Sequence, residues 1–435
     1  MIQQFVEATN LYGIAKLGEQ WTNTDADEIH KLIVVVIYMG INHSATLRHY
    51  WARDSRSPFV TALFPSRDRF LILYRCFYIN TGERDSEDPL WHVRPLVDSL
   101  NISFPKHHSP ERDLVFDEMM IACKARSRLK QYLKGKPHKW GYKVWCLESG
   151  GYVQNFSIYN GNRVGLPKES PSKALERMVT PYQGNHHLIY MNNLFSSPEL
   201  SRSLLEKQIY SSGTARTNRI DFPKSLTENV PKKQRGYWRF LQKGKLVAYL
   251  FVDKKPVYFL STFHSPTRTR NITRRDKKGK RIDLVVPEIV DYYNMFRGRV
   301  DRLDQFLAYY PMPRKSRRPW PRLAWWLIEL CTINAHRLYE IKQNAKFTLL
   351  DTRQRLMHEL AGDISVPLSH SKLTRMTFTH MNQIGHWPAK TLSQGRCYYC
   401  YHVKKIRKDV TNKCGLCDKY LCIYDCFKLH HIAPA

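Results

Sequence analysis

The stretch that decides the fold is "HHLIYMNNLFSSPELSRSLLEKQIYSSGTART", residues 186–217. It opens with a short apolar run, Leu188 to Met191, which predicts a buried strand that ends on two asparagines. Ser197 then stands as a helix cap with Pro198 at the first helical position, so a helix follows. The segment "GTART" returns to a strand pattern. A strand, a crossover helix and a second strand predict a mixed α/β layer.

The flanking segments extend this sheet. Short apolar runs bounded by Gly, Pro, Asn and Ser predict strands in "DLVFDEMMIA" (113–122), "HKWGYKVWCLES" (138–149) and "GYVQNFSIYNG" (151–161). A polar, strand-rich region from Asn218 to Pro287 contains a predicted β-meander. It ends in "TRTRNITRRDKKGKR" (267–281), which is predicted to be a loop too charged to pack.

Helical patterns occupy both ends of the chain. The segment "TDADEIHKLIVVVIYMGI" (24–41) has Thr24 or Asp25 as its cap, and "SRDRFLILYRCFYI" (66–79) has Ser66. Residues 287–310 and 321–344 are also predicted to be helical, and Asp363 to Gly395 is predicted to be a linker. With 435 residues, the chain is long enough for two or three domains.

The charge of the chain favours a polyanionic partner. There are 69 Lys and Arg residues against 38 Asp and Glu residues, a formal net charge of +31. Nucleic acid is the leading candidate for that partner. Aromatic residues make up 12% of the sequence, which indicates a large folded body and not merely a basic tail. No signal peptide is evident in residues 1–10. The apolar segment 32–41 is about half the length that a membrane span requires, so no membrane association is expected.

Acidic residues form two pairs with the spacing of a metal site. Asp117 and Glu118 lie in a predicted strand, and Asp301 and Asp304 are three residues apart, which places both on one face of a helix. Like charges held this close favour a divalent cation between them. The alternative is that Asp301 and Asp304 only form ion pairs with nearby arginines: Arg299, Arg302 or Arg314.

Several motifs together resemble the piggyBac family of DDE transposases and their domesticated descendants. They are "TNLYG" (9–13), "LRHYWARD" (47–54), "RDRF" (67–70), "FDEMMIACKARSRLKQYLKGKPHKWGYKVW" (116–145), "GTARTNR" (213–219), "FVDKKPVYFLST" (251–262) and "VDRLDQ" (300–305). They follow the order of the family and cover nearly the whole chain.

The resemblance implies an α/β fold: a ribonuclease-H-like DDE transposase core with a β-rich insertion, a helical DNA-binding and dimerisation region, and a small zinc-binding C-terminal domain. It also implies a homodimer. The implied boundaries are 1–112 and 311–390 for the two parts of the helical region, 113–217 and 288–310 for the core, 218–287 for the insertion, and 391–435 for the zinc domain.

In the family, acids at the positions of Asp117, Asn192, Asp301 and Asp304 hold two Mg²⁺ ions for phosphodiester transfer. This chain has Asn192 where the resemblance implies an aspartate, which removes one negative charge. Arg297 and Arg299 also stand beside Asp301 in "RGRVD". Because Mg²⁺ depends on anionic oxygens, the site is predicted to be impaired, and Mg²⁺ is expected only if some activity survives.

Basic runs interleaved with aromatic residues predict contacts with DNA phosphates. The predicted DNA-binding residues are Lys124, Arg126, Arg128, Lys130, Lys136, Lys139, Arg274, Arg275, Lys277, Lys278, Arg314, Lys315, Arg317 and Arg318. Any single run also fits a solvated face or a nuclear-import signal.

The cysteines divide into two groups. Cys76, Cys123, Cys146 and Cys331 stand singly in apolar surroundings and are predicted to be buried thiols of a reducing compartment. The other six cluster near the C-terminus with two histidines, which suits two tetrahedral zinc ions. The predicted ligands are Cys397, Cys400, Cys414, Cys417, Cys422, Cys426, His430 and His431. The resemblance implies an interleaved arrangement, in which Cys397 and Cys400 share one zinc with a later pair. A redox cluster or a single-zinc module is the alternative.

The sequence therefore predicts a nuclear, DNA-binding, transposase-derived protein with a disabled strand-transfer site. The first alternative is an active or weakly active Mg²⁺-dependent cut-and-paste DNA transposase. The second is a chromatin scaffold whose zinc tail binds a protein partner.

Overall fold

The computed structural model describes residues 1–160, 170–275, 279–312, 318–362, 388–414, 417–423 and 426–432. The chain divides into two compact units. The first comprises residues 1–47 and 66–363, and the second comprises residues 48–65 and 364–435. The predicted linker, residues 363–395, lies outside the described residues as far as residue 387.

A mixed sheet of nine strands forms the centre of the first unit. Strand β1 pairs antiparallel with β3 and parallel with β5, which in turn pairs parallel with β6. Strands β2 and β4 both pair antiparallel with β3. The bounds are β1 (Asp113–Ala122), β2 (Gln131–Tyr132), β3 (Trp140–Ser149), β4 (Tyr152–Ile158), β5 (Leu188–Met191) and β6 (Tyr210–Thr214). The mixed α/β prediction is confirmed.

The two faces of β1 have different partners because successive side chains point to opposite faces of a sheet. Phe116 belongs to an apolar cluster that includes Leu175 of α6 (Pro171–Val179) and Leu200 of α7 (Pro198–Glu206). The next residue, Asp117, is therefore directed toward the other face. As predicted, Ser197 caps α7, accepting a hydrogen bond from the backbone N–H of Leu200.

The predicted strand "GTART" is partly wrong, because strand β6 begins at Tyr210 and ends at Thr214. The beginning of β6 was not predicted because Ser211 and Ser212 are polar, although both are buried beside β5 and β9.

The insertion continues the same sheet through β9 (Pro256–Ser261), β8 (Leu246–Val252) and β7 (Trp238–Lys243). The predicted charged loop 267–281 is wrong: it contains β10 (Thr269–Arg275), which pairs with β11 (Arg281–Pro287) as a hairpin. Ile272 on β10 packs with Val286 and Ile289 in an apolar cluster, while Arg270 and Arg275 of β10 are exposed. Ile272 on β10 and Val286 on β11 therefore pack the hairpin against this cluster.

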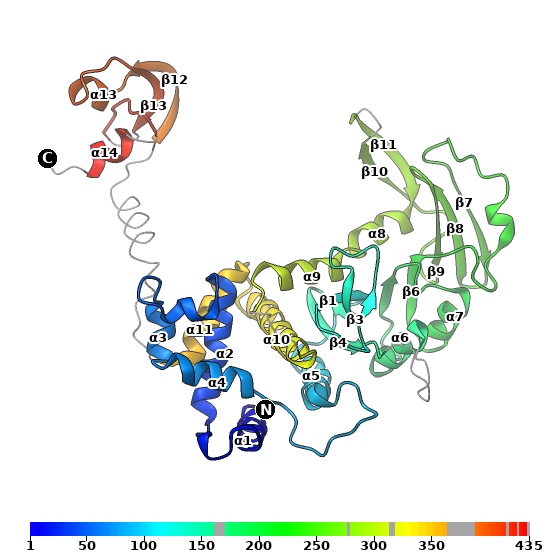
Figure 1. Cartoon of the computed structure of the whole chain (residues 1–435). Coiled ribbons are helices and arrows are strands. Elements are labelled where there is room, and N and C mark those ends of the chain that lie inside the picture. Colours follow the sequence, from blue (N-terminus) through cyan, green and yellow to red (C-terminus); the bar gives the residue numbers. More distant parts are fainter. Residues whose placement is uncertain are drawn as a thin grey trace. The chain divides into compact units, whose positions relative to one another are not determined.

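Helices make up the N-terminal and later parts of this unit. They are α1 (Ile2–Leu17), α2 (Ala26–Ile41), α4 (Arg67–Cys76), α5 (Arg94–His107), α8 (Glu288–Phe296), α9 (Arg299–Tyr309), α10 (Trp320–Gln343) and α11 (Leu349–Ala361). Asp25 caps α2 and Ser66 caps α4, both as predicted. Among the described residues, we find no helix with the length and apolar character needed to cross a bilayer. Helices α8 and α9 lead the chain from the β10–β11 hairpin back to β1 (Figure 1).

The second unit contains α3 (Pro58–Leu63) and a small C-terminal module. Strands β12 (Pro388–Arg396) and β13 (Asp409–Cys414) pair antiparallel, and the short helices α13 (Tyr398–His402) and α14 (Cys426–Ile432) accompany them. The apolar core of the module consists of its cysteines together with Leu421 and Phe427.

Candidate functional site

The first part of the candidate site is made by two parallel strands. In the register of β1 and β5, Phe116 pairs with Met191. The residues that follow them, Asp117 and Asn192, are consequently neighbours although they are 75 positions apart in the chain. Asp117 is buried, with 9% of its surface exposed.

The side-chain amide of Asn192 donates to carboxylates. Its Nδ2 lies 2.7 Å from Oδ1 of Asp117 and 3.1 Å from Oε2 of Glu118. Its Oδ1 accepts a hydrogen bond of 2.8 Å from the backbone N–H of Leu194. That N–H can only donate, so it fixes which end of the amide faces the acids. Asn192 therefore directs hydrogen atoms toward the acids.

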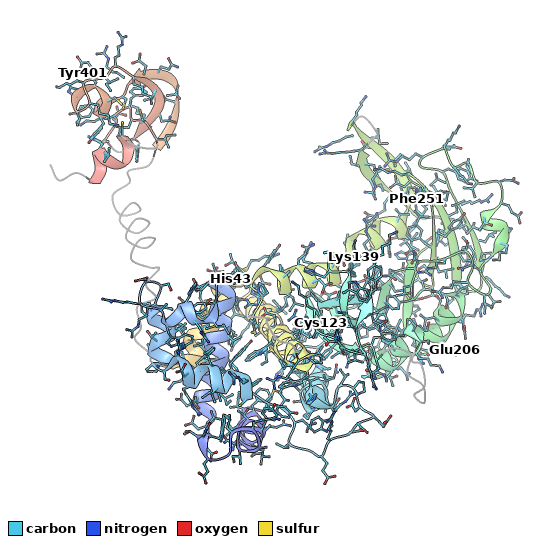
Figure 2. All side chains as sticks on the ribbon, in the orientation of Figure 1. His43, Cys123, Lys139, Glu206, Phe251 and Tyr401 are labelled. Atoms are coloured by element: carbon cyan, nitrogen blue, oxygen red, sulfur yellow. The ribbon has the colours of Figure 1, made fainter. Side chains whose placement is uncertain are left out.

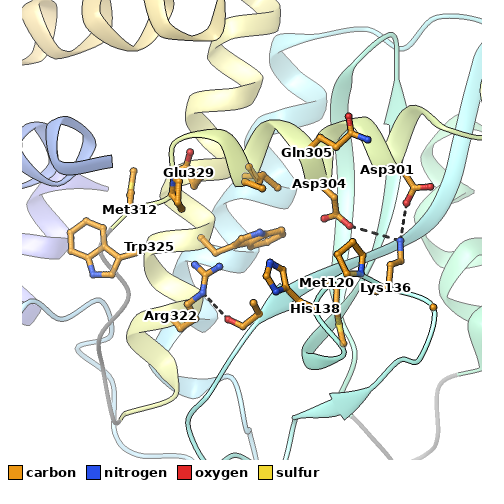
Figure 3. Close-up of a pocket in the computed structure, with 17 residues that line it drawn as sticks. Met120, Lys136, His138, Asp301, Asp304, Gln305, Met312, Arg322, Trp325 and Glu329 are labelled. Carbon is orange, nitrogen blue, oxygen red and sulfur yellow. Dashed lines mark hydrogen bonds and ion pairs between the residues drawn. The ribbon is translucent and has the colours of Figure 1, made fainter. Parts of the chain in front are cut away.

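The helical acids complete the cluster. Asp301 and Asp304 lie on α9, which packs on β1, and Asp304 accepts a hydrogen bond from the backbone of Met120. The ammonium of Lys136 lies 3.0 Å from Oδ1 of Asp301 and 3.8 Å from Oδ2 of Asp304 (Figure 3). It also donates a hydrogen bond of 2.7 Å to the carbonyl of Glu118. Neither Arg299 nor Arg302 forms an ion pair with these acids in the described part of the chain, where Lys136 is their ion-pair partner. Arg314 lies outside the described residues.

Burial raises the proton affinity of two of these acids. Desolvation, then the neighbouring Glu118, raises the pKa of Asp117 to about 8. Desolvation also raises the pKa of Asp304 to about 7, although Lys136 acts in the opposite direction. An isolated aspartate carboxyl has a pKa near 3.8, which is the value expected in the unfolded chain. In the folded protein, both carboxyls therefore keep their proton to a much higher pH.

The arrangement does not suit the two Mg²⁺ ions that the resemblance implied. Mg²⁺ binds oxygen lone pairs, preferably anionic ones. The atom that Asn192 directs between Asp117 and Glu118 is an N–H donor, and reversing the amide would separate its oxygen from the Leu194 N–H. Asp117, Asp301 and Asp304 remain available as oxygen ligands, but the ligand from β5 is lacking.

We expect the stability of this site to fall as pH rises. A carboxyl whose pKa is raised by folding binds its proton more tightly in the folded state, so the folded state loses stability between about pH 4 and pH 8. The variant Asp117→Asn cannot titrate there. Its melting temperature, measured against that of the natural protein, should be higher at pH 8 than at pH 5. An equal difference at both pH values would contradict the raised pKa.

A cavity of about 370 Å³ adjoins the cluster (Figure 3). Asp301, Asp304 and Lys136 line one part of it, while Arg322 and Trp325 of α10 line another. Sequence reasoning did not single out His138, which also lines the cavity, nor the ion-pair role of Lys136. Lys136 and Asp301 are 165 positions apart, and no spacing rule connects them.

The predicted DNA-binding residues are placed differently from one another. Lys124, Arg126, Arg128, Lys139 and Arg275 are exposed, Lys130 and Arg274 are half-buried, and Lys277, Lys278, Arg314, Lys315 and Arg317 lie outside the described residues. Arg318 is engaged within the protein, since it donates a hydrogen bond of 3.1 Å to the hydroxyl of Tyr12 and one of 2.7 Å to the carbonyl of Arg75. The ammonium of Lys136 is occupied by the acids. A role in DNA binding stays a prediction for all of them.

The C-terminal module brings together four cysteines that suit zinc. The sulfur atoms of Cys397, Cys400, Cys422 and Cys426 all lie within 4.8 Å of one another. Sγ of Cys400 is 3.3 Å from that of Cys426 and 3.8 Å from that of Cys422. A tetrahedral zinc–thiolate site with bonds of about 2.3 Å has sulfur separations of roughly 3.8 Å. The residues therefore fit one zinc ion, which would cross-link the two halves of the module.

Cys397 and Cys400 thus meet a later pair, in the interleaved order that the resemblance implied. The remaining predicted ligands are Cys414, Cys417, His430 and His431. Cys414 and Cys417 are in side-chain contact, but the side chain of His431 lies outside the described residues. Among the described residues, one group of three or more ligands has metal-site spacing, so the second zinc ion stays a prediction.

Comparisons with known proteins extend over nearly the whole chain. A model of a DDE transposase family, described as Transposase IS4, matches residues 1–336. The human (Homo sapiens) PiggyBac transposable element-derived protein 3 is 26% identical over 437 residues, which cover 96% of this chain and 72% of that protein. The human PiggyBac transposable element-derived protein 2 is also 26% identical, over 92% of this chain and 70% of its own length.

A solved structure has the same fold. It is the cryo-EM structure of the piggyBac transposase synaptic complex with hairpin DNA. It matches with a TM-score of 0.72 at 23% identity, over 97% of this chain and 92% of that one. The similarity therefore includes the helical region, the sheet with its insertion, and the cysteine module.

Proposed function

This chain belongs to the piggyBac family of DDE transposases, and we propose that it is a nuclear DNA-binding protein whose own strand-transfer site is impaired. Binding would persist because it depends on basic surfaces, whereas phosphodiester chemistry depends on the acids around β1. We also propose that the protein works as a homodimer, which sedimentation analysis would test.

The orientation of the Asn192 amide is the observation that carries the proposal. Its N–H group points at Asp117 and Glu118, in the place where a two-metal site needs an anionic oxygen. Removing a single electrostatic element from an active site typically lowers the rate by about 10² to 10³. Strand transfer is consequently expected to be at least 100-fold slower than in a variant with the acid restored.

DNA binding is supported by charge and by fold. A net charge of +31 concentrates polyanions at the surface, exposed lysines and arginines follow β1, and Arg275 is exposed at the end of β10. The related piggyBac transposase was solved in a complex with hairpin DNA. We extend DNA binding to the zinc module of this chain as part of the proposal.

Two assays on the full chain separate the proposal from its alternatives. The natural protein should bind duplex DNA with strongly salt-dependent affinity and should not nick it measurably in Mg²⁺, whereas Asn192→Asp should nick it. Mg²⁺-dependent nicking by the natural protein at the same rate as the variant would identify a working transposase.

Deletion of residues 395–435 tests the role of the zinc module. If the module binds DNA, the affinity for duplex DNA should fall by about tenfold or more, since several phosphate contacts are lost. Unchanged DNA affinity would favour a module that binds a protein partner instead.

A further inference from the structure

A basic surface lies beside the candidate site, in the insertion. A cavity of about 870 Å³ opens between the β8–β9 turn, the end of β10, and α8. We name it the insertion groove. Its lining includes Asn193, Thr214 and Tyr293 at one end, and Phe251 and Arg275 on two of its walls. The label of Phe251 in Figure 2 locates the β8 wall of the groove.

The insertion groove starts next to the acid cluster. Asn193 directly follows Asn192, and Thr214 is the last residue of β6, the strand beside β5. Thr214 is fixed by a 3.1 Å hydrogen bond between its hydroxyl and that of Tyr293 on α8. The carboxyl ends of β5 and β6 therefore form one end of the groove, and the end of β10, with Arg274 and Arg275, forms the other.

Positive charge dominates the lining. Six cationic side chains line the groove against one acid, Asp253. Even this acid is engaged, since its carboxylate lies 2.6 Å from Arg235 and 3.8 Å from Arg274. Arg235 also donates a hydrogen bond of 2.9 Å to the carbonyl of Arg275. Through its contacts with Asp253 and Arg275, it connects the β8–β9 turn to β10. Arg235 is thus a positioning residue that holds the two walls together.

The remaining cations are available to a ligand. Lys254, Lys255, Arg275 and Arg297 are all exposed, and they come from the β8–β9 turn, β10 and the end of α8. Mutual repulsion among them, with Asp253 already paired, is relieved by a ligand that carries several negative charges in a row. Tyr258 and Val257 provide a half-buried apolar floor between them.

We propose that the insertion groove binds the phosphate backbone of the DNA segment that extends from the acid cluster toward the β10–β11 hairpin. This rests on the proposed function, and it assigns a DNA path that does not depend on Asn192 or on metal. The contacts are to phosphates, so binding in the groove is independent of base sequence.

The test compares two charge-matched variants of the full chain. Lys254→Glu with Lys255→Glu changes the groove. Lys243→Glu with Lys245→Glu makes the same change of charge at the other end of β8, about 20 Å away. All four lysines are exposed, so folding should be unaffected. The probe is a 30-bp duplex of arbitrary sequence, titrated at several salt concentrations.

Each lost phosphate contact lowers the slope of log affinity against log salt by about 0.9. The groove variant should therefore lose roughly 1.8 units of slope and about tenfold or more in affinity at 0.1 M salt, whereas the control should keep most of both. Equal losses of affinity and of salt dependence in the two variants would contradict DNA binding in the groove and leave the proposed function intact. Absence of duplex binding by the natural protein would overturn both proposals.

Discussion

Chelation of zinc is expected to unfold the C-terminal cysteine module while the sheet around β1 and β5 stays folded. The apolar core of the module consists mostly of its own cysteines, with Leu421 and Phe427. Such a small core cannot offset the conformational entropy of residues 397–432, so the free energy of metal binding supplies the folding. For structural zinc, that free energy is about 10 to 16 kcal/mol at neutral pH.

Amide hydrogen exchange on the full chain measures this effect. Protection of residues 397–432 should be lost with chelator and also in Cys400→Ser, while β1 and β5 keep theirs. Cys331→Ala serves as the control, because Cys331 lies on α10 in the first unit and is not one of the four clustered cysteines. Protection of the module that survives both chelator and Cys400→Ser would show that zinc does not hold it.

Asn192→Asp should destabilise the zinc-loaded protein by about 2 to 4 kcal/mol in the absence of other divalent cations. The substitution removes the N–H donor to Asp117 and Glu118 and adds a third carboxyl group beside them. A divalent ion between the oxygens should reverse the loss. An ion that binds only the folded protein contributes about 2.7 kcal/mol at 100 times its dissociation constant. Thermal unfolding with and without Mn²⁺ measures both the loss of stability in the variant and its recovery by the ion.

The neighbouring asparagine is the control for this experiment. Asn193→Asp makes the same chemical change one residue later. There the side chain is exposed, and its oxygen already accepts a hydrogen bond of 3.4 Å from Nε of Arg216. Its free energy of unfolding should stay within about 0.5 kcal/mol of that of the natural protein, and its melting temperature should not respond to Mn²⁺. Loss of stability in both variants alike would mean that Asn192 has no special place among the acids.

Much of the fold follows from local signals in the sequence. The caps at Asp25, Ser66 and Ser197 identify three helix starts, because a side-chain oxygen at that position satisfies an otherwise unpaired N–H. The beginning of strand β6 and the β10–β11 hairpin were missed for the opposite reason. Ser211 and Ser212 are buried only by neighbouring strands, and the arginines of β10 conceal the one apolar side chain that seats it.

The candidate site shows the same limit. The sequence and the family resemblance pointed to Asp117, Asn192, Asp301 and Asp304, and the structure brings them into one cluster through β1, β5 and α9. The ion pairs of Lys136 could not be predicted, because they join residues 165 positions apart through a tertiary contact. The direction of the Asn192 amide also depends on a backbone N–H that only the folded turn supplies.

The most direct test of the central claim, that Asn192 disables the acid site, is calorimetric titration of Mn²⁺ into the zinc-loaded natural protein and its Asn192→Asp variant. No DNA site needs to be known, and Mn²⁺ prefers the same oxygen ligands as Mg²⁺. The account predicts no binding heat from the natural protein and saturable binding by the variant. Equal binding by both proteins would show that the amide is tolerated as a ligand and would contradict the impaired site.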